Sequence, residues 1–315
     1  MKNIIKTAVI GVGNMGKNHA RIFSQISKLI AVSDTDKNVG RAIAKKYDTR
    51  YYQDYRSMLK KEKLDAVSVA VPTKNHMRVA VECLSNKIPT LVEKPIADNV
   101  ADARKILDEA KKYKTLLMVG HTERFNPAVV RLKEILRSNK LGTIVNLLAA
   151  RIGIYPPRVA GLDVAVDLAI HDIDVINFLL GEFPKRKKAV KTQVFSYSKA
   201  DSSSFILEYS KATAVIHANW ITPVKIRKLF VSGTEGFAEL DYIRQKLILY
   251  QKVMQLSKYG DYLDFLSLSD TPQKIEFVSK KEPLKEELTF FLDHYKDYRH
   301  TIQAEEAVKG LEVSL

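Results

Sequence analysis

Three ionisable residues in the stretch "DVAVDLAIHDID" have a spacing that suits proton transfer. Asp167, His171 and Asp174 lie at positions i, i+4 and i+7, and on a helix these positions share one face. A histidine flanked by carboxylates is a better base and is held in one orientation, so His171 is a candidate acid–base residue. A surface ion cluster is the alternative. The same spacing could hold a metal, but we find no further matching ligand and predict none.

A glycine-rich turn near the start of the chain is a second candidate site. Gly11, Gly13 and Gly16 form the pattern G-x-G-x-x-G after an expected strand and before an expected helix. Gly11 permits the tight turn, Gly13 lets the backbone approach a pyrophosphate, and Gly16 lets the helix pack against the strand. The amides at the helix start, with Asn14 and Met15, would face the phosphates. A glycine turn in another α/β fold is the alternative.

Asp34 ends the next expected strand, 18 residues after Gly16. A carboxylate at this position accepts hydrogen bonds from the adenosine ribose and repels a 2′-phosphate, which favours NAD over NADP. Lys37 and Arg41 are close enough in sequence to weaken this preference. Asp34 could also be the N-cap of the following helix, and the two roles could coexist.

The elements that must position these residues change in rhythm along the chain. In the first 120 residues, near-continuous apolar strands alternate with amphipathic helices, which predicts a parallel sheet covered on both faces. Beyond them, strand-like segments follow one another closely, interrupted by a helix at about 166–180, and the tail returns to helix. We therefore predict an α/β protein: a doubly wound parallel sheet in residues 1–120, and in residues 121–315 an α/β domain with a large, mainly antiparallel sheet.

Composition excludes several classes of protein. The 315 residues carry one cysteine, Cys83, so no intrachain disulfide is possible, which fits a cytoplasmic location. We expect Cys83 to be buried, with a reactive thiol as the alternative. No apolar run is long enough for a membrane span.

The net charge of +15 could favour binding of nucleic acid or of phosphorylated small ligands. However, the densest basic run, 185–188, is expected to be a solvated loop, and no nucleic-acid motif accompanies it.

The ordered motifs "GVGNMG", "VPTKNH", "EKP", "GHTERFNP" and "DLAIHDID" resemble those of the glucose–fructose oxidoreductase / inositol dehydrogenase (Gfo/Idh/MocA) family, over nearly the whole chain. The resemblance implies a Rossmann domain followed by an α/β domain with an open sheet. It also implies that Lys94, in Glu93-Lys94-Pro95, lies between nicotinamide and substrate, with Glu93 near the nicotinamide. A cis bond before Pro95 would turn the lysine toward the cleft. A surface Glu–Lys pair is the plain alternative.

The resemblance assigns further residues to the cofactor. Pro72, Thr73 and His76 match the cofactor-contacting loop, although His76 could simply begin its helix. His121 and Arg124 match a crossover segment near the nicotinamide, although Arg124 could equally be a structural ion-pair partner.

The resemblance also places Asp167 and His171 in the site, facing Lys94, so that either His171 or Lys94 takes the proton. Asp174 is expected to support the helix. Arg151, Tyr155 and Arg158, in the loop before the helix, are candidates to bind a diphosphate or carboxylate, or to stack on a base or sugar.

The motifs look most like the branch that oxidises the 3-hydroxyl of UDP-N-acetylglucosamine or its uronate. Alternatives are an inositol or free-sugar dehydrogenase, a reductase of another carbonyl compound or a tetrapyrrole, a cofactor-sensing regulatory protein and a nucleic-acid binder. One face of the second sheet, with Ile216 and Trp220 as candidates, is expected to be apolar and covered by a partner, giving a homodimer or homotetramer.

Overall fold

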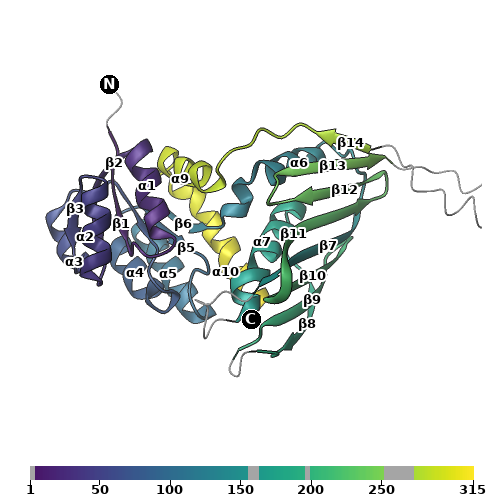
Figure 1. Ribbon diagram of the computed structural model, residues 1–315, viewed down its shortest axis with the longest axis horizontal. Helices are drawn as coiled ribbons and strands as arrows, with labels where there is room; N and C mark the ends of the chain where they lie inside the picture. Colours follow the sequence, from purple (N-terminus) through teal and green to yellow (C-terminus); the bar gives the residue numbers. More distant parts are fainter. Residues whose placement is uncertain (1–3, 155–162, 196–198, 252–272) are drawn as a thin grey trace, which may run out of the picture. The chain divides into compact units, whose positions relative to one another are not determined.

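The computed structural model describes residues 4–154, 163–195, 199–251 and 273–315. It divides into two compact units (Figure 1). The first unit consists of residues 1–122 and 282–312, and the second of residues 123–281 and 313–315. Residues 282–312 therefore group with the first unit, whereas the predicted second domain included all of residues 121–315. No helix in the described part of the chain is long and apolar enough to cross a membrane.

The first unit contains a six-stranded parallel sheet in the order β3-β2-β1-β4-β5-β6, the strand order of a dinucleotide-binding doubly wound fold. Its strands are β1 (Lys6–Ile10), β2 (Lys28–Ser33), β3 (Arg50–Tyr52), β4 (Ala66–Val69), β5 (Thr90–Glu93) and β6 (Leu117–Gly120). All residues of β4, β5 and β6 are buried, as expected for strands that are covered on both faces.

Two helices of the first unit begin at side-chain caps that accept a hydrogen bond from the backbone amide of the third helical residue. Asp36 and Asn99 accept hydrogen bonds from backbone amides at the starts of α2 and α5, which satisfies N–H groups that have no partner within the helix. The helices are α1 (Gly16–Ile26), α2 (Lys37–Lys46), α3 (Tyr55–Lys61), α4 (His76–Ser85), α5 (Val100–Tyr113), α9 (Pro283–Asp293) and α10 (Ile302–Ser314), with short 3₁₀ turns η1 (Thr73–Asn75) and η6 (Tyr298–Thr301). A further 3₁₀ turn, η2 (Thr122–Phe125), begins at the last residue of the 1–122 segment and continues into the second unit.

Residues near the C-terminus complete the first unit. The Thr301 hydroxyl accepts a hydrogen bond from the backbone N–H of Leu117 in β6. Ion pairs join Arg21 of α1 to Glu282, and Lys111 of α5 to Glu305 of α10. The first unit is therefore not one continuous segment of the chain.

The second unit contains an eight-stranded sheet in the order β14-β13-β12-β11-β7-β10-β9-β8. Its neighbouring strands are antiparallel except for β7 and β10, which confirms the predicted mainly antiparallel sheet. The strands are β7 (Ile144–Ile154), β8 (Arg186–Thr192), β9 (Ser202–Glu208), β10 (Thr213–Asn219), β11 (Ile221–Gly233), β12 (Gly236–Asp241), β13 (Lys246–Gln251) and β14 (Gln273–Glu276).

One face of this sheet is covered by helices. Helices α6 (Pro127–Arg137) and α7 (Ile170–Leu180) pack on it, and a π-helical turn, η3 (Ala165–Ala169), leads into α7 (Figure 1). The shared core includes Leu147, Phe205 and Leu229.

Two expectations for the second unit are wrong in detail. Ile216 and Trp220 are 0% and 3% exposed, because they belong to this core rather than to an open face. The basic run at 185–188 is not simply a loop, because Arg186 begins the edge strand β8, which is exposed along its length. Charged residues suit such an edge because they disfavour pairing with another chain.

Candidate active site

The glycine turn of the first unit fits a bound dinucleotide. Gly11 has φ of +85°, and a Cβ there would lie 2.8 Å from the backbone of Ala70. A Cβ on Gly16 would lie 1.7 Å from the Gly11 oxygen, so only glycine allows α1 to begin here. Around Gly13, by contrast, no heavy atom lies within 4 Å of the Cβ position. Gly13, Asn14 and Met15 are exposed, which leaves room for a pyrophosphate at the helix start.

Asp34 lies at the end of β2, beside this turn. Its carboxylate accepts hydrogen bonds from the backbone N–H groups of Val12 and Asp36, at 2.8 and 2.9 Å. The N-cap of α2 is Asp36, not Asp34. The alternative role of Asp34 as a helix cap is therefore excluded, and its carboxylate fixes the glycine turn against the end of β2.

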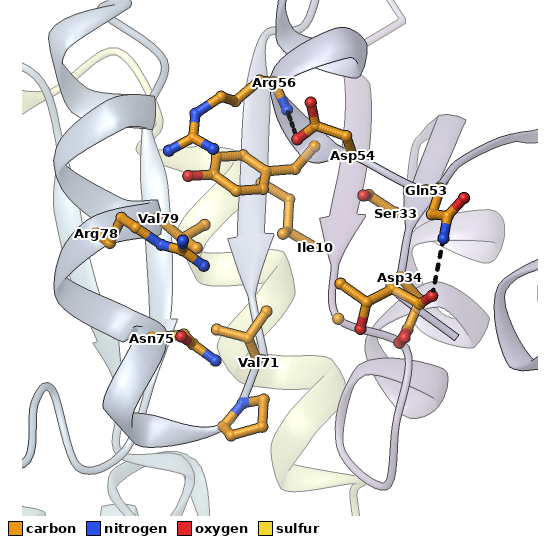
Figure 2. Close-up of a pocket in the computed structure, with 14 residues that line it drawn as sticks. Ile10, Ser33, Asp34, Gln53, Asp54, Arg56, Val71, Asn75, Arg78 and Val79 are labelled. Atoms are coloured by element: carbon orange, nitrogen blue, oxygen red, sulfur yellow. Dashed lines mark hydrogen bonds between the residues drawn. The ribbon is translucent and has the colours of Figure 1, made fainter. Parts of the chain in front are cut away.

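A cavity of about 300 Å³ opens next to Asp34. Figure 2 shows Asn75 and Arg78 on the side opposite Asp34 and Gln53. Tyr55 also lines the cavity, and its hydroxyl donates a hydrogen bond to Glu82. Burial, followed by this hydrogen bond, raises the pKa of Tyr55 to about 12. The cavity has the place that the adenosine half of a dinucleotide takes in this fold.

No sequence motif marks residues 53–56, which form one wall of this cavity. These residues follow β3, a strand of three residues without an apolar run, so no periodic pattern marked it. Arg56 is held by Glu82, whose carboxylate accepts from its Nε at 2.9 Å.

Glu93 and Lys94 lie where β5 ends. The peptide bond between Lys94 and Pro95 is cis, as the resemblance implied. The backbone N–H of Lys94 donates to the Glu93 carboxylate at 3.2 Å. The Lys94 side chain is partly exposed, whereas the Glu93 side chain is buried.

A buried histidine fixes Glu93. His19 Nε2 lies 2.8 Å from Glu93 Oε1, and His19 Nδ1 lies 2.6 Å from the Ser68 hydroxyl. Burial favours the neutral form of Glu93, but the hydrogen bond and charge of His19, with the charge of Lys94, outweigh it and lower the pKa of Glu93. His19 and Ser68 were not among the predicted site residues, because neither lies in a recognised motif.

His76 supports the segment that carries Lys94. Its ring nitrogens lie 2.9 Å from the Pro95 carbonyl oxygen and 2.8 Å from the Val71 carbonyl oxygen. The ring is buried, and burial is the main cause that lowers its pKa. Pro72 is exposed and Thr73 partly exposed, in the η1 turn before α4. His76 thus joins the loop after β4 to the loop after β5.

In the second unit, Asp167 lies in the π-helical turn and His171 at the start of α7. Both side chains are partly exposed. Single π turns inside helices often mark functional sites. Asp174 is instead buried, and it accepts two hydrogen bonds from Arg124, at 2.8 and 2.7 Å. This contact gives Asp174 the supporting role expected of it, and it gives Arg124 a structural ion pair.

Arg151 is 1% exposed. Its guanidinium contacts Asp172 at 2.6 Å and Glu123 at 3.0 Å. Arg151 therefore fixes the first turn of α7 against β7.

Tyr155 and Arg158 lie outside the described residues. His121, at the end of β6, is buried in the first unit.

No group of three or more His, Cys, Asp or Glu residues in the described ranges could hold a metal ion. Cys83 is buried within α4, and burial raises the pKa of its thiol, which disfavours the reactive thiolate.

The parallel sheet, the glycine turn and the acidic residue at the end of β2 define a dinucleotide-binding enzyme. Comparison with known proteins identifies the family. A model described as "Oxidoreductase family, NAD-binding Rossmann fold" matches residues 5–121, and one described as "GFO/IDH/MocA C-terminal domain" matches residues 129–239. The chain belongs to the Gfo/Idh/MocA family of oxidoreductases, and its cofactor is a nicotinamide dinucleotide.

Among curated relatives, UDP-N-acetylglucosamine 3-dehydrogenase of Acidithiobacillus ferrooxidans is 28% identical over 249 residues, which are 79% of this chain and 77% of that protein. Inositol 2-dehydrogenase of Rubrobacter xylanophilus is 30% identical over 183 residues, 56% of this chain and 53% of that protein. A solved structure of the Acidithiobacillus ferrooxidans enzyme has a TM-score of 0.86 at 24% identity, covering 98% of this chain and 95% of that one, and shows the common fold.

Proposed function

We propose that this protein is an NAD-dependent dehydrogenase that oxidises a ring hydroxyl of a sugar or nucleotide sugar. The first substrate to test is UDP-N-acetylglucosamine, at its 3-hydroxyl. The observation that carries the proposal is the position of Lys94, at the carboxyl end of β5 in the unit with the glycine turn, beside a Glu93 fixed by His19. Similarity to a UDP-N-acetylglucosamine 3-dehydrogenase and to an inositol 2-dehydrogenase supports a cyclic polyhydroxyl substrate.

The proposed chemistry couples hydride transfer to the removal of a proton. When bound, the nicotinamide accepts the hydride from the carbinol carbon. Lys94 donates a hydrogen bond to the reacting hydroxyl and orients it. Lys94 or His171 takes the hydroxyl proton, and Asp167 is a further proposed residue of this site. His76 keeps the loop that carries Lys94 in place through the Pro95 carbonyl.

NAD is the proposed cofactor rather than NADP. Asp34 is held by two backbone amides at the end of β2, where a carboxylate accepts hydrogen bonds from ribose hydroxyls and repels a 2′-phosphate. In this proposal, Glu93, Pro72, Thr73, His121 and the glycine turn complete the cofactor site.

The direct test is the absorbance of NADH at 340 nm when purified protein, NAD and UDP-N-acetylglucosamine are mixed. Myo-inositol, free hexoses and other UDP-sugars form the comparison set. Absence of NADH formation with every one of these compounds would reject the substrate class. Lys94→Ala should lower kcat by about 10²- to 10⁴-fold if Lys94 acts in proton transfer, and near-normal turnover of this variant would reject its role.

The pH dependence separates the two candidate bases. If His171 takes the proton, His171→Asn should remove the acidic limb of the kcat profile, because a histidine base becomes inactive when protonated. If Lys94 is the base, that limb stays in His171→Asn.

Association of the chain into a homodimer or homotetramer remains a proposal. Leu148 and Ile206 are 42% and 50% exposed on neighbouring parts of the second sheet, and apolar patches of this kind are often covered by a partner. Sedimentation as a monomer at micromolar concentration would contradict it.

A further inference from the structure

Arg227 is a largely buried arginine without a direct acidic partner in the part of the chain that the structure describes. It lies on β11 and is only partly exposed. Among the described residues, no carboxylate lies within ion-pair distance of its guanidinium, and none of its side-chain N–H groups donates a hydrogen bond. An arginine in this state has five donors available for a ligand.

The Arg227 side chain lies on the helix-covered face of the second sheet. Leu229 and Val231, two and four residues further along β11, belong to the buried core of that face, and alternation along a strand places Arg227 on the same side. Arg227 pairs in register with Arg151 of β7. The two guanidinium groups therefore come from directly opposed positions of neighbouring strands.

The nearby carboxylates contact Arg151 rather than Arg227. Asp172 and Glu123 both form ion pairs with Arg151. They act on Arg227 only through longer-range electrostatic attraction. Burial and the charge of Arg151 outweigh this attraction and lower the pKa of Arg227.

Lys225 adds a second cation. It lies two residues before Arg227, and its Cγ is 3.9 Å from the point where a Cβ of Gly153 would stand. Gly153 follows Arg151 by two positions on β7, so Lys225 borders the same face. The charge of Arg227, followed by burial and the charge of Arg151, lowers the pKa of Lys225.

These cations lie close to the candidate base. Asp172, which contacts Arg151 at 2.6 Å, follows His171 directly in the first turn of α7. Asp167, in the π-helical turn, is close enough to Arg227 to act on its charge. Arg227 therefore borders the part of the second unit from which Asp167 and His171 come.

We propose that Arg227, with Lys225, binds an anionic substituent of the substrate, a phosphate or a carboxylate, next to His171. This inference rests on the proposed function and narrows it to a charged sugar such as a nucleotide sugar or a uronate. A guanidinium suits either anion because it can donate two parallel hydrogen bonds to it. A neutral inositol or hexose has no group for this site.

The test measures binding, so that it does not depend on turnover. Isothermal titration calorimetry of the full-length protein would use UDP as the diphosphate probe, glucuronate as the carboxylate probe, and N-acetylglucosamine as the neutral probe. Arg227→Gln should weaken binding of the anionic probe by about 10- to 100-fold, the loss expected for a hydrogen bond to a charged group. Arg227→Lys should keep part of the affinity for the anionic probe, because lysine retains the positive charge.

Lys228→Gln is the matched control. Lys228 is the next residue of β11, projects from the opposite face and pairs with Glu239, so its replacement removes the same charge without touching the site. Thermal unfolding of each variant checks that its fold is intact.

The result with each probe has a definite meaning. Loss of UDP binding in Arg227→Gln but not in Lys228→Gln supports a phosphate site, and the same pattern with glucuronate supports a carboxylate site. Equal effects of the two substitutions, unchanged binding in Arg227→Gln, or no binding of either anion by the wild type overturns the inference. NADH formation from a neutral sugar, unaffected by Arg227→Gln, would overturn it while the proposed dehydrogenase activity stands.

Discussion

The imidazole of His19 joins the Ser68 hydroxyl to the Glu93 carboxylate, at 2.6 and 2.8 Å, inside the first unit. If Nε2 donates to Glu93, the neutral ring accepts at Nδ1 from Ser68. The three residues come from α1, β4 and β5. They hold the residue before Lys94 in one position, so the lysine is placed by buried polar contacts as well as by its own strand.

The first prediction concerns the acid stability that depends on Glu93. Its pKa is lowered in the fold, so its charge stabilises the protein above the unfolded pKa of about 4.3 and is lost as pH falls through the folded pKa. Glu93→Gln should lower the free energy of unfolding by about 1–3 kcal/mol at pH 7. The loss should shrink below about pH 4, as measured by urea denaturation.

The exposed Glu235 provides the control for this experiment. Glu235→Gln should leave the free energy of unfolding within about 0.5 kcal/mol of the wild type at pH 7. A constant difference between Glu93→Gln and the wild type from pH 7 to pH 3 would contradict the prediction.

The second prediction concerns cofactor choice. Asp34→Asn retains an oxygen that can accept one of the two backbone hydrogen bonds but removes the negative charge. The ratio of kcat/KM for NAD to that for NADP should fall about 10-fold or more. NAD loses a charged acceptor for its ribose hydroxyls, and the 2′-phosphate of NADP is no longer repelled by a carboxylate. Fluorescence titration with NADH and NADPH gives the same comparison without turnover. An unchanged ratio would mean that Asp34 does not select the cofactor.

The third prediction separates the structural and binding roles of the glycines. Gly16→Ala places a Cβ 1.7 Å from the Gly11 oxygen, so it should lower the free energy of unfolding by about 1–3 kcal/mol or more. Gly13→Ala meets no atom within 4 Å and should keep the fold but weaken NADH binding, since the new methyl group occupies space beside the turn. Thermal melts and NADH fluorescence check both effects.

Gly310, in α10, is the control glycine for this pair. A Cβ there also meets no atom within 4 Å, and alanine is the better helix former, so Gly310→Ala should leave stability unchanged or raise it by up to about 1 kcal/mol. Equal NADH affinity in Gly13→Ala and Gly310→Ala would argue against close approach of a pyrophosphate to Gly13.

The fourth prediction concerns the buried pair of Arg124 and Asp174. Removing either partner leaves an uncompensated buried charge, so Arg124→Met or Asp174→Leu should cost about 3–5 kcal/mol of the free energy of unfolding. The double variant should be less destabilised than the sum of the two, as a double-mutant cycle by chemical denaturation measures. Simple additivity would show that the pair does not act as a unit.

Periodic patterns explain what the sequence could predict of the fold. The apolar runs before Gly11 and Asp34 mark β1 and β2, and the glycine spacing identifies the turn between β1 and α1. Strand β3 was missed because Arg50, Tyr51 and Tyr52 form a short edge strand with no apolar run. Strand alternation places Ile216 and Trp220 on one face of the second sheet but cannot tell which face the helices cover.

The candidate site depends on contacts that sequence spacing does not contain. His19 and Glu93 are 74 residues apart, and only the order of strands in the sheet brings them together. Arg151 looked like a ligand-binding arginine, yet two acids of its own unit surround it. No sequence motif marks Arg227, and its position opposite Arg151 follows only from the pairing of β11 with β7.

The division of the chain also affects how the protein is made. The first unit needs residues 282–312, which include α9 and most of α10. Ribosomes produce these residues well after residues 1–122, so the glycine turn and the sheet emerge long before the helices that pack with them. A messenger truncated before codon 282 would therefore deprive the first unit of helices that it needs.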